Sequence, residues 1–558
     1  MKKIIITLLL ISAGLTSFAE NPKWAAKASK SIFTLTTFNA DGILIASSNG
    51  FFIGENGEAI SNFAPFRNAT KAVIIDASGK KYDVVSMLGA NDIYDVAKFR
   101  VNTKKSVPLT IAAQPSTEGS DVWLMPYTVK KEANCIQGKV KKAEKFKDNY
   151  TYYTFSLTAP ENTVSCPFMN ANGEVIGLMQ QPAKTRDTLS YAICTQYGAD
   201  MKTSGLSIND AALKATNIKT EIPDDPDQAL VYIYMAAGSS DSSKFVSVIN
   251  DYIAKYPDSS DGYIYRAQYE TNSNDFASAE KDMDQAIKIA KKKDDVHYNY
   301  SKLIFQKEII KSTIPYAGWN LDKAASEVSE AYNINPLPLY RNHLAQIYFA
   351  QKKYQEACDI YMELTKTNLR SAQLFYSAAR CKELMKSDTI AIYALLDSAV
   401  NFYTKPYLKE ASPYLLARAE YLMKMKRYRE AVNDYNEYEK VMIADVNANF
   451  YYVREQAELK GRLFKQALDD IAKAISMNPT ADYYAEQSSL QLRVNMIDEA
   501  IASAKECIRL APDYSDGYLF LGLSLIEKKN KEEGLKNLKK AKELGDTQAD
   551  ALIEKYSK

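Results

Sequence analysis

The feature that most constrains the fold is a repeat of 33 to 36 residues in the second half of the chain. Segments such as YREAVNDYNEY (428–438) and FKQALDDIAKAISMNP (464–479) share one template, with a small residue at a fixed place. A period of this length indicates stacked helix pairs, because one pair cannot bury its apolar face alone. The small residues at the fixed place are Ala279, Ala324, Ala357, Ala431, Ala467, Ala500 and Gly534.

Most copies carry a second small residue twelve positions earlier, on the preceding helix, where it lets two antiparallel helices approach closely. These residues are Ala267, Ala345, Ala419, Ser488 and Gly522. Prolines such as Pro479 and Pro512 end the second helices, since proline cannot continue a helix. This pattern resembles the tetratricopeptide repeat. The resemblance implies an all-α superhelical solenoid over residues 229–558, with about eight or nine repeats.

The first half of the chain has a different pattern. From about residue 29 to residue 203, about ten β-rich runs are separated by turn sequences such as Asn56-Gly57 and Asn172-Gly173. Many short strands at this spacing predict an all-β barrel or sandwich. Residues 204–228 contain a short helical segment and the acidic, proline-containing stretch EIPDDPD, which is typical of a linker. We therefore expect two independently folding units joined at 204–228.

Three motifs of the first half resemble the trypsin-like serine peptidases, in particular the exported bacterial HtrA branch. They are SNGFFIGENGEAISNFAPF (48–66), YDVAKFRV (94–101) and NTVSCPFMNANGEVIGLM (162–179). The resemblance implies a double β-barrel over residues 20–203. It also implies where the catalytic residues fall: the histidine position is Ala64, the aspartate position is Asp95, and the serine position is Val164. The glycines that the family has in the oxyanion loop and after the serine fall on Asn162, Ser165 and Cys166.

Two of the three catalytic groups are therefore missing. A serine nucleophile needs a base, usually histidine, and the two histidines of the chain, His297 and His343, both lie in the helical half. We expect a degenerate peptidase domain that is not an enzyme, in which Asp95 accepts backbone hydrogen bonds where the barrels join. An unorthodox peptidase site with Ser165 or Cys166 as nucleophile and a lysine as base is the alternative.

The N-terminus predicts export. Two lysines precede an apolar run and the small residues Ser17 and Ala19, which is the pattern of a signal peptide over residues 1–19. No second long apolar run follows, so we expect a mature chain without a membrane segment, in a bacterial periplasm or otherwise exported. That compartment permits disulfides, and we expect one among Cys135, Cys166 and Cys194.

The expected partner is a protein. The net charge of +2 disfavours nucleic acid, and neither cofactor motifs nor metal-ligand spacings occur. The repeat register predicts neighbouring rows of outward-facing residues on the first helices, which bind an extended or helical peptide segment. Its residues are Gln346, Tyr452, Gln456, Leu519, Leu523 and Ile526. The leading hypothesis is an exported, non-catalytic scaffold or adaptor. A chaperone-like holder of unfolded chains is a third reading, and no oligomeric state follows from the sequence.

Overall fold

The computed structural model describes residues 21–129, 134–147, 149–182, 188–238 and 242–557. The predicted signal peptide lies outside these residues. By internal packing the chain divides into two compact units. The first extends to Tyr269 and includes Ser278–Ile289, and the second comprises Glu270–Ala277 and Ala290–Lys558. The first helices of the repeat region therefore belong to the same unit as the β half.

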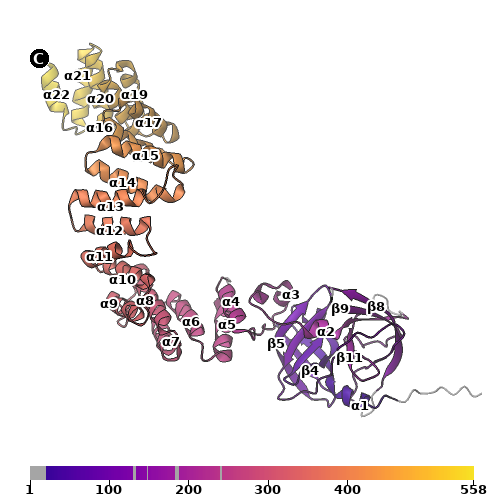
Figure 1. Cartoon of the computed structure of the whole chain (residues 1–558). Helices are drawn as coiled ribbons and strands as arrows, with labels where there is room; N and C mark the ends of the chain where they lie inside the picture. The colour runs from indigo at the N-terminus through magenta and orange to yellow at the C-terminus, as the bar shows by residue number, and fades with distance from the viewer. Residues whose placement is uncertain (1–20, 130–133, 148, 183–187, 239–241, 558) are drawn as a thin grey trace, which may run out of the picture. The chain divides into compact units, whose positions relative to one another are not determined.

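The β half forms two closed antiparallel barrels (Figure 1). The strands of the first barrel follow the order β1-β2-β3-β6-β5-β4, and those of the second the order β10-β11-β12-β9-β8-β7. Two short helices flank them, α1 (Ala25–Ala28) and α2 (Thr195–Ala199). The strands are β1 (Ile32–Phe38), β2 (Leu44–Phe52), β3 (Glu58–Ser61), β4 (Lys71–Ile75), β5 (Lys81–Asn91), β6 (Val96–Val101), β7 (Asp121–Leu124), β8 (Ile136–Phe146), β9 (Tyr150–Ser156), β10 (Pro167–Met169), β11 (Val175–Met179) and β12 (Ser190–Cys194).

Each barrel closes around its own apolar core, because alternate residues of a strand point to opposite faces. Phe33, Phe66 and Phe99 are fully buried in the first barrel, and the Phe99 ring contacts the rings of the other two. In the second barrel Phe155 stacks on Phe168 with ring centroids 4.0 Å apart. The two cores adjoin, because a few side chains of the first barrel pack in the cluster that fills the second.

The segment predicted as a linker is part of the first barrel instead. It forms a short 3-10 turn (Ser207–Asn209) and α3 (Ala211–Lys214), and then runs along β5. The Met87 amide donates to the Lys219 carbonyl at 2.8 Å, and the Glu221 amide donates to the Met87 carbonyl at 2.9 Å. Leu213 and Ile218 are buried in the core of this barrel. The buried apolar side chains and the backbone hydrogen bonds to β5 fix this segment on the barrel, although residues 221–227 have the composition of a linker.

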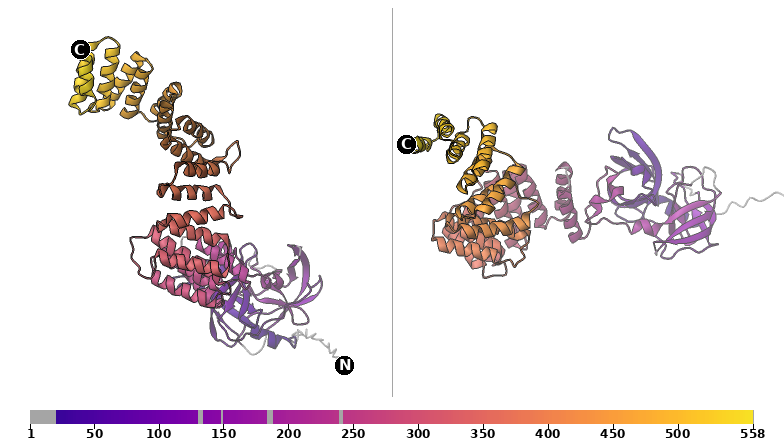
Figure 2. Two further views of the ribbon diagram at one scale, coloured as in Figure 1. Left: turned by 60° about the vertical axis from the view of Figure 1, so that its left-hand side comes forward. Right: turned by 90° about the horizontal axis from the view of Figure 1, so that it is seen from above.

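The helical half runs from α4 to α22, and successive helices from α8 onward lie side by side in chain order (Figures 1 and 2). The helices are α4 (Pro226–Ala237), α5 (Ser242–Lys255), α6 (Ser260–Asn272), α7 (Phe276–Ile289), α8 (Lys293–Ile310), α9 (Leu321–Ile334), α10 (Pro338–Ala350), α11 (Tyr354–Leu364), α12 (Ala372–Leu384), α13 (Thr389–Val400), α14 (Ser412–Lys424), α15 (Tyr428–Met442), α16 (Ala448–Lys460), α17 (Phe464–Met477), α18 (Ala481–Arg493), α19 (Ile497–Leu510), α20 (Ser515–Glu527), α21 (Lys531–Glu543) and α22 (Ala549–Ser557). None of the helices in the described residues is both long and apolar enough to cross a membrane.

The small residues do what the repeat template predicts. Ala357, Ala431 and Ala467 are completely buried between paired helices. In the last pair, a Cβ atom added to Gly534 would lie 2.8 Å from the Gly522 carbonyl oxygen, so α20 and α21 approach too closely for a larger residue. The predicted fold class, an all-β double barrel followed by an all-α solenoid, is confirmed.

Candidate functional site

Ala64, Asp95 and Val164, the positions that the resemblance assigns to a catalytic triad, lie along a polar seam between the two barrels. Asp95 lies between β5 and β6 and has a positive φ of 46°. Its Oδ1 accepts a hydrogen bond from the Ala64 amide at 2.7 Å, and its Oδ2 accepts one from the Asn62 side-chain amide at 3.3 Å. Both carboxylate oxygens therefore hold the segment after β3 in place.

Ser165, the residue after Val164, is completely buried. Its Oγ donates to Asn62 Oδ1 at 2.9 Å and accepts from the Asn62 backbone amide at 2.8 Å. Both of these partners lie on the first barrel, on one residue that cannot act as a base. Ser165 therefore connects the second barrel to Asn62 of the first.

Cys166, the other alternative nucleophile, is also completely buried. Burial raises the pKa of its thiol to about 12, so the thiol stays protonated at neutral pH. The backbone amides of residues 165 and 166 also have hydrogen-bond partners within the second barrel and its loop. The Ser165 amide donates to the Met179 carbonyl at 2.9 Å, and the Cys166 amide donates to the Thr163 carbonyl at 3.0 Å.

A second contact across the seam fixes the loop before β10. The Asn49 side-chain amide donates to the carbonyl oxygens of Asn162 and Val164, at 2.8 and 3.0 Å. Asn162 and Ser165, which occupy the family's glycine positions, both have positive φ values, 64° and 66°. The loop thus has the positive φ values that favour glycine, and two of its carbonyl oxygens accept hydrogen bonds from the first barrel.

The predicted disulfide is absent, because all six cysteines are free. Cys166 immediately precedes β10 and Cys194 ends β12, and β11 lies between these two strands in the barrel. Cys135 immediately precedes β8, on the other side of β9 from β12. The order of the strands therefore separates the three cysteines that the sequence grouped together.

The predicted groove residues have unequal exposure. Gln346 is exposed, and Gln456, Leu523 and Ile526 are half-buried. Leu519 is only 3% exposed, and it packs in a cluster with Leu538, Ala541 and Ala549. The outward position predicted for Leu519 is wrong, because the close approach of α20 and α21 draws that side chain into the core. Tyr452 is also half-buried, with its ring 5.1 Å from the Tyr483 ring.

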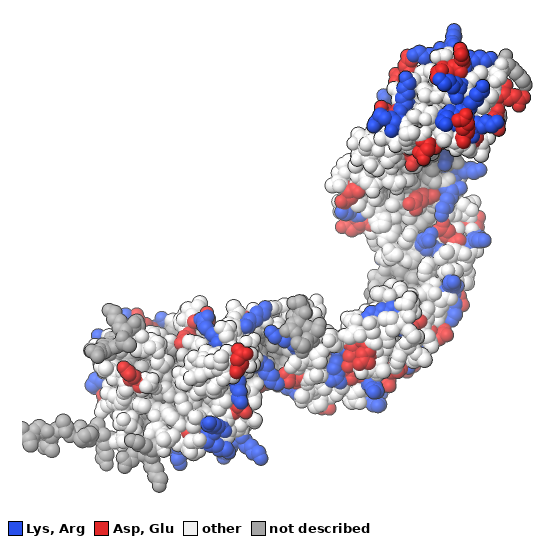
Figure 3. Space-filling view, turned by 180° about the vertical axis from the view of Figure 1, so that it is seen from behind, with Lys and Arg blue, Asp and Glu red and all other residues white. Residues whose placement is uncertain are grey.

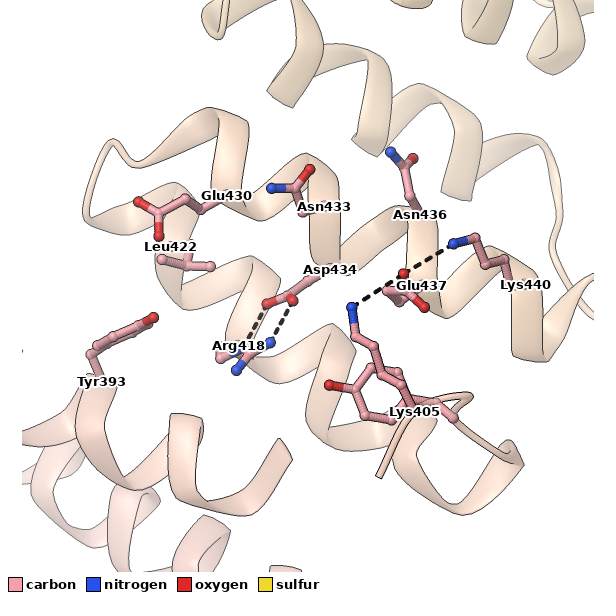
Figure 4. Close-up of a pocket in the computed structure, with 11 residues that line it drawn as sticks. Tyr393, Lys405, Arg418, Leu422, Glu430, Asn433, Asp434, Asn436, Glu437 and Lys440 are labelled. Atoms are coloured by element: carbon pink, nitrogen blue, oxygen red, sulfur yellow. Dashed lines mark hydrogen bonds and ion pairs between the residues drawn. The ribbon is translucent and has the colours of Figure 1, made fainter. Parts of the chain in front are cut away.

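A polar pocket of about 440 Å³ lies between the α13–α14 connection, α14 and α15 (Figure 4). Arg418 donates to both carboxylate oxygens of Asp434, and Lys405 and Lys440 lie 3.5 and 3.0 Å from Glu437. Each positive charge in the pocket therefore has a carboxylate partner. The sequence analysis did not identify this pocket, and the long connection between Val400 and Ser412 is the signal that could have found it.

We expect Ser165→Ala to lower the free energy of unfolding of the barrels by about 1–3 kcal/mol, since it removes the hydrogen-bond acceptor of the buried Asn62 backbone amide. Ser165→Gly loses the same contacts but relieves the positive φ, so the loss should be smaller. Guanidinium denaturation measures both. Ser47→Ala, at an exposed serine of β2, is the control. Equal stability of Ser165→Ala and the control would contradict the connecting role.

Comparisons with known proteins found one family model and solved protease structures that are similar to this chain. A tetratricopeptide repeat model matches residues 340–369. Among solved structures, the active form of the Rv3671c protease from M. tuberculosis is similar with a TM-score of 0.29 and 16% identity, over 36% of this chain and 92% of that chain. The serine endoprotease from Yersinia pestis is similar with a TM-score of 0.27 and 14% identity, over 31% of this chain and 61% of that chain. No curated protein matches the chain.

Proposed function

We propose that the protein is an exported, non-catalytic scaffold that binds another protein through its repeats. The observation that carries this proposal is the state of the seam between the barrels. Ala64 and Val164 occupy the positions of base and nucleophile, and the neighbouring hydroxyl of Ser165 is buried and bonded to Asn62. A triad works through a nucleophile in hydrogen-bond contact with a base. The described residues of the barrels contain no histidine to supply that base.

The repeats support a role in protein binding. Tetratricopeptide arrays present an extended surface built from the first helix of each pair. On the face shown in Figure 3, acidic and basic side chains lie intermingled along the helical half. Mixed charge of this kind favours a protein partner over a polyanion. The N-terminal sequence pattern supports export.

Site-specific crosslinking tests the groove. A photoreactive residue at Gln346 or Gln456 should capture one stoichiometric partner in cells, because both lie on first helices. Gln466 is the matched control: it is exposed, but it lies on α17, the second helix of its pair. Crosslinking at Gln466 alone would place the partner on the other face. Many weak products at every position would favour the chaperone-like reading instead.

A further inference from the structure

Glu455 breaks the repeat template. It stands in α16 at the place where five other first helices have a small residue: Ala267, Ala345, Ala419, Ser488 and Gly522. The side chain is completely buried. Its Oε2 accepts a hydrogen bond from the Gln456 side-chain amide at 2.8 Å, whereas its Oε1 has no partner among the described residues. An ionised carboxylate in this position would be costly, because it lacks a compensating charge or a full set of hydrogen bonds.

Glu458, one turn further along α16, has a similar environment. It is 2% exposed, and its Oε2 has no hydrogen-bond partner in the part of the chain that the structure describes. The nearest cation is Arg454, whose Nε lies 3.9 Å from Glu458 Oε1. That guanidinium is already committed, because it binds both carboxylate oxygens of Asp470 at 2.6 and 2.9 Å and Glu439 at 2.6 Å.

The charges on the neighbouring helices do not bring the pKa of either glutamate down to its usual value. From α18 Glu486 raises the pKa of Glu455, and from α17 Asp470 raises the pKa of Glu458. Glu439 of α15 forms ion pairs with both Arg454 and Lys473. Lys473 lies on α17, is half-exposed, and is also 3.6 Å from Asp470.

Lys460, on α16 itself, is exposed, and it offsets only part of the rise in the pKa of Glu455. Burial is the largest cause for both glutamates, and it raises the pKa of each to about 8. A bound metal is not the alternative occupant, because no group of three or more ligating side chains in the described residues is arranged to hold one.

We propose that Glu455 and Glu458 are a pair of proton-binding sites that make the packing of α16 against α15, α17 and α18 depend on pH. Both carboxyls keep their protons while the helices are packed, and loss of the protons loosens these repeats. The folded chain binds more protons than the unfolded chain. Stability from this source is therefore complete below the ordinary carboxyl pKa of 4.5 and is lost as the pH rises through about 8.

Hydrogen exchange on the full chain at pH 6 and pH 9, corrected for intrinsic exchange rates, tests the proposal. We expect protection of residues 448–493 to fall about tenfold or more relative to α10 and α11. Glu455→Ala, which restores the small residue of the other repeats, combined with Glu458→Gln should remove most of this difference. Glu499→Gln, at an exposed glutamate of α19, should leave the difference unchanged.

Two results would overturn the proposal. One is equal protection of residues 448–493 in the natural chain at both pH values. The other is a pH dependence that persists in the double variant. If the alanine variant fails to fold, Glu455→Gln with Glu458→Gln keeps the side-chain volume and removes the titration, so the same comparison can be made.

Discussion

A fragment that ends at residue 203 is expected not to fold, whereas a fragment that ends at Glu221 should fold as the barrel pair. The shorter fragment has the boundary that strand pattern and composition suggest. It lacks α3 and the extended segment after it, which complete the core of the first barrel. Leu213 and Ile218 are each only 7% exposed in the full chain. Burying two such side chains contributes about 3–6 kcal/mol, out of about 5–15 kcal/mol for a whole domain.

Polar contacts add to this loss. Arg100 of β6 donates to both carboxylate oxygens of Glu221, at 2.7 and 2.9 Å, and Ser86 of β5 donates to the same carboxylate at 2.7 Å. Without Glu221 the half-buried guanidinium of Arg100 loses its bidentate partner. Burial opposes ionisation of Glu221, but the hydrogen bonds from Arg100 and Ser86 outweigh it and hold the pKa of Glu221 below its usual value.

Near-ultraviolet circular dichroism and thermal melting of the two fragments, both starting at residue 20, provide the measurement. The longer fragment should give a cooperative transition and a tertiary signal, and the shorter one should give neither. The two fragments differ only by residues 204–221, so the longer one is a matched control. A cooperative melt of the shorter fragment at the same temperature would show that this segment is dispensable.

The sequence predicted the two fold classes because each rests on local signals. Small residues at a fixed period determine where helices can approach, and Asn-Gly turns between β-rich runs mark the strands. The segment 204–228 was predicted to be a linker because its stretch EIPDDPD combines acidic residues with two prolines. Its contribution to the barrel depends on backbone bonds between Met87 and residues that follow it by more than 130 positions. A local pattern does not report such contacts.

The candidate site was predictable in part. Motif positions placed Ala64, Asp95 and Val164 together. The contact between Ser165 and Asn62 was not predictable, since the residues are 103 positions apart and the direction of the hydroxyl depends on an unusual backbone conformation. Leu519 was misplaced because its repeat position does not report how closely α20 and α21 pack. Glu455 was visible in the sequence as a departure from the small-residue template, and only its burial revealed its significance.

Peptidase activity is expected to be absent and hard to restore. We expect no hydrolysis of casein by the purified protein, and we expect Ala64→His with Val164→Ser to remain inactive. The double variant restores a base and a nucleophile, but Asn162 and Ser165 would still occupy the glycine positions of the loop. Oxyanion donors must be placed to within a fraction of an ångström, and loss of one donor alone lowers the rate by about 100- to 1,000-fold. Adding Asn162→Gly and Ser165→Gly to the double variant tests whether the loop is the remaining obstacle.

The most direct test of a non-catalytic barrel pair is labelling with a fluorophosphonate probe, which reacts only with an activated serine. Folded, full-length protein should remain unlabelled under conditions that label trypsin completely. The hydroxyl of Ser165 is buried, and both of its hydrogen bonds are to Asn62. Labelling of the natural protein that disappears in Ser165→Ala, while Ser47→Ala is still labelled, would contradict the proposal and establish a serine-type enzyme.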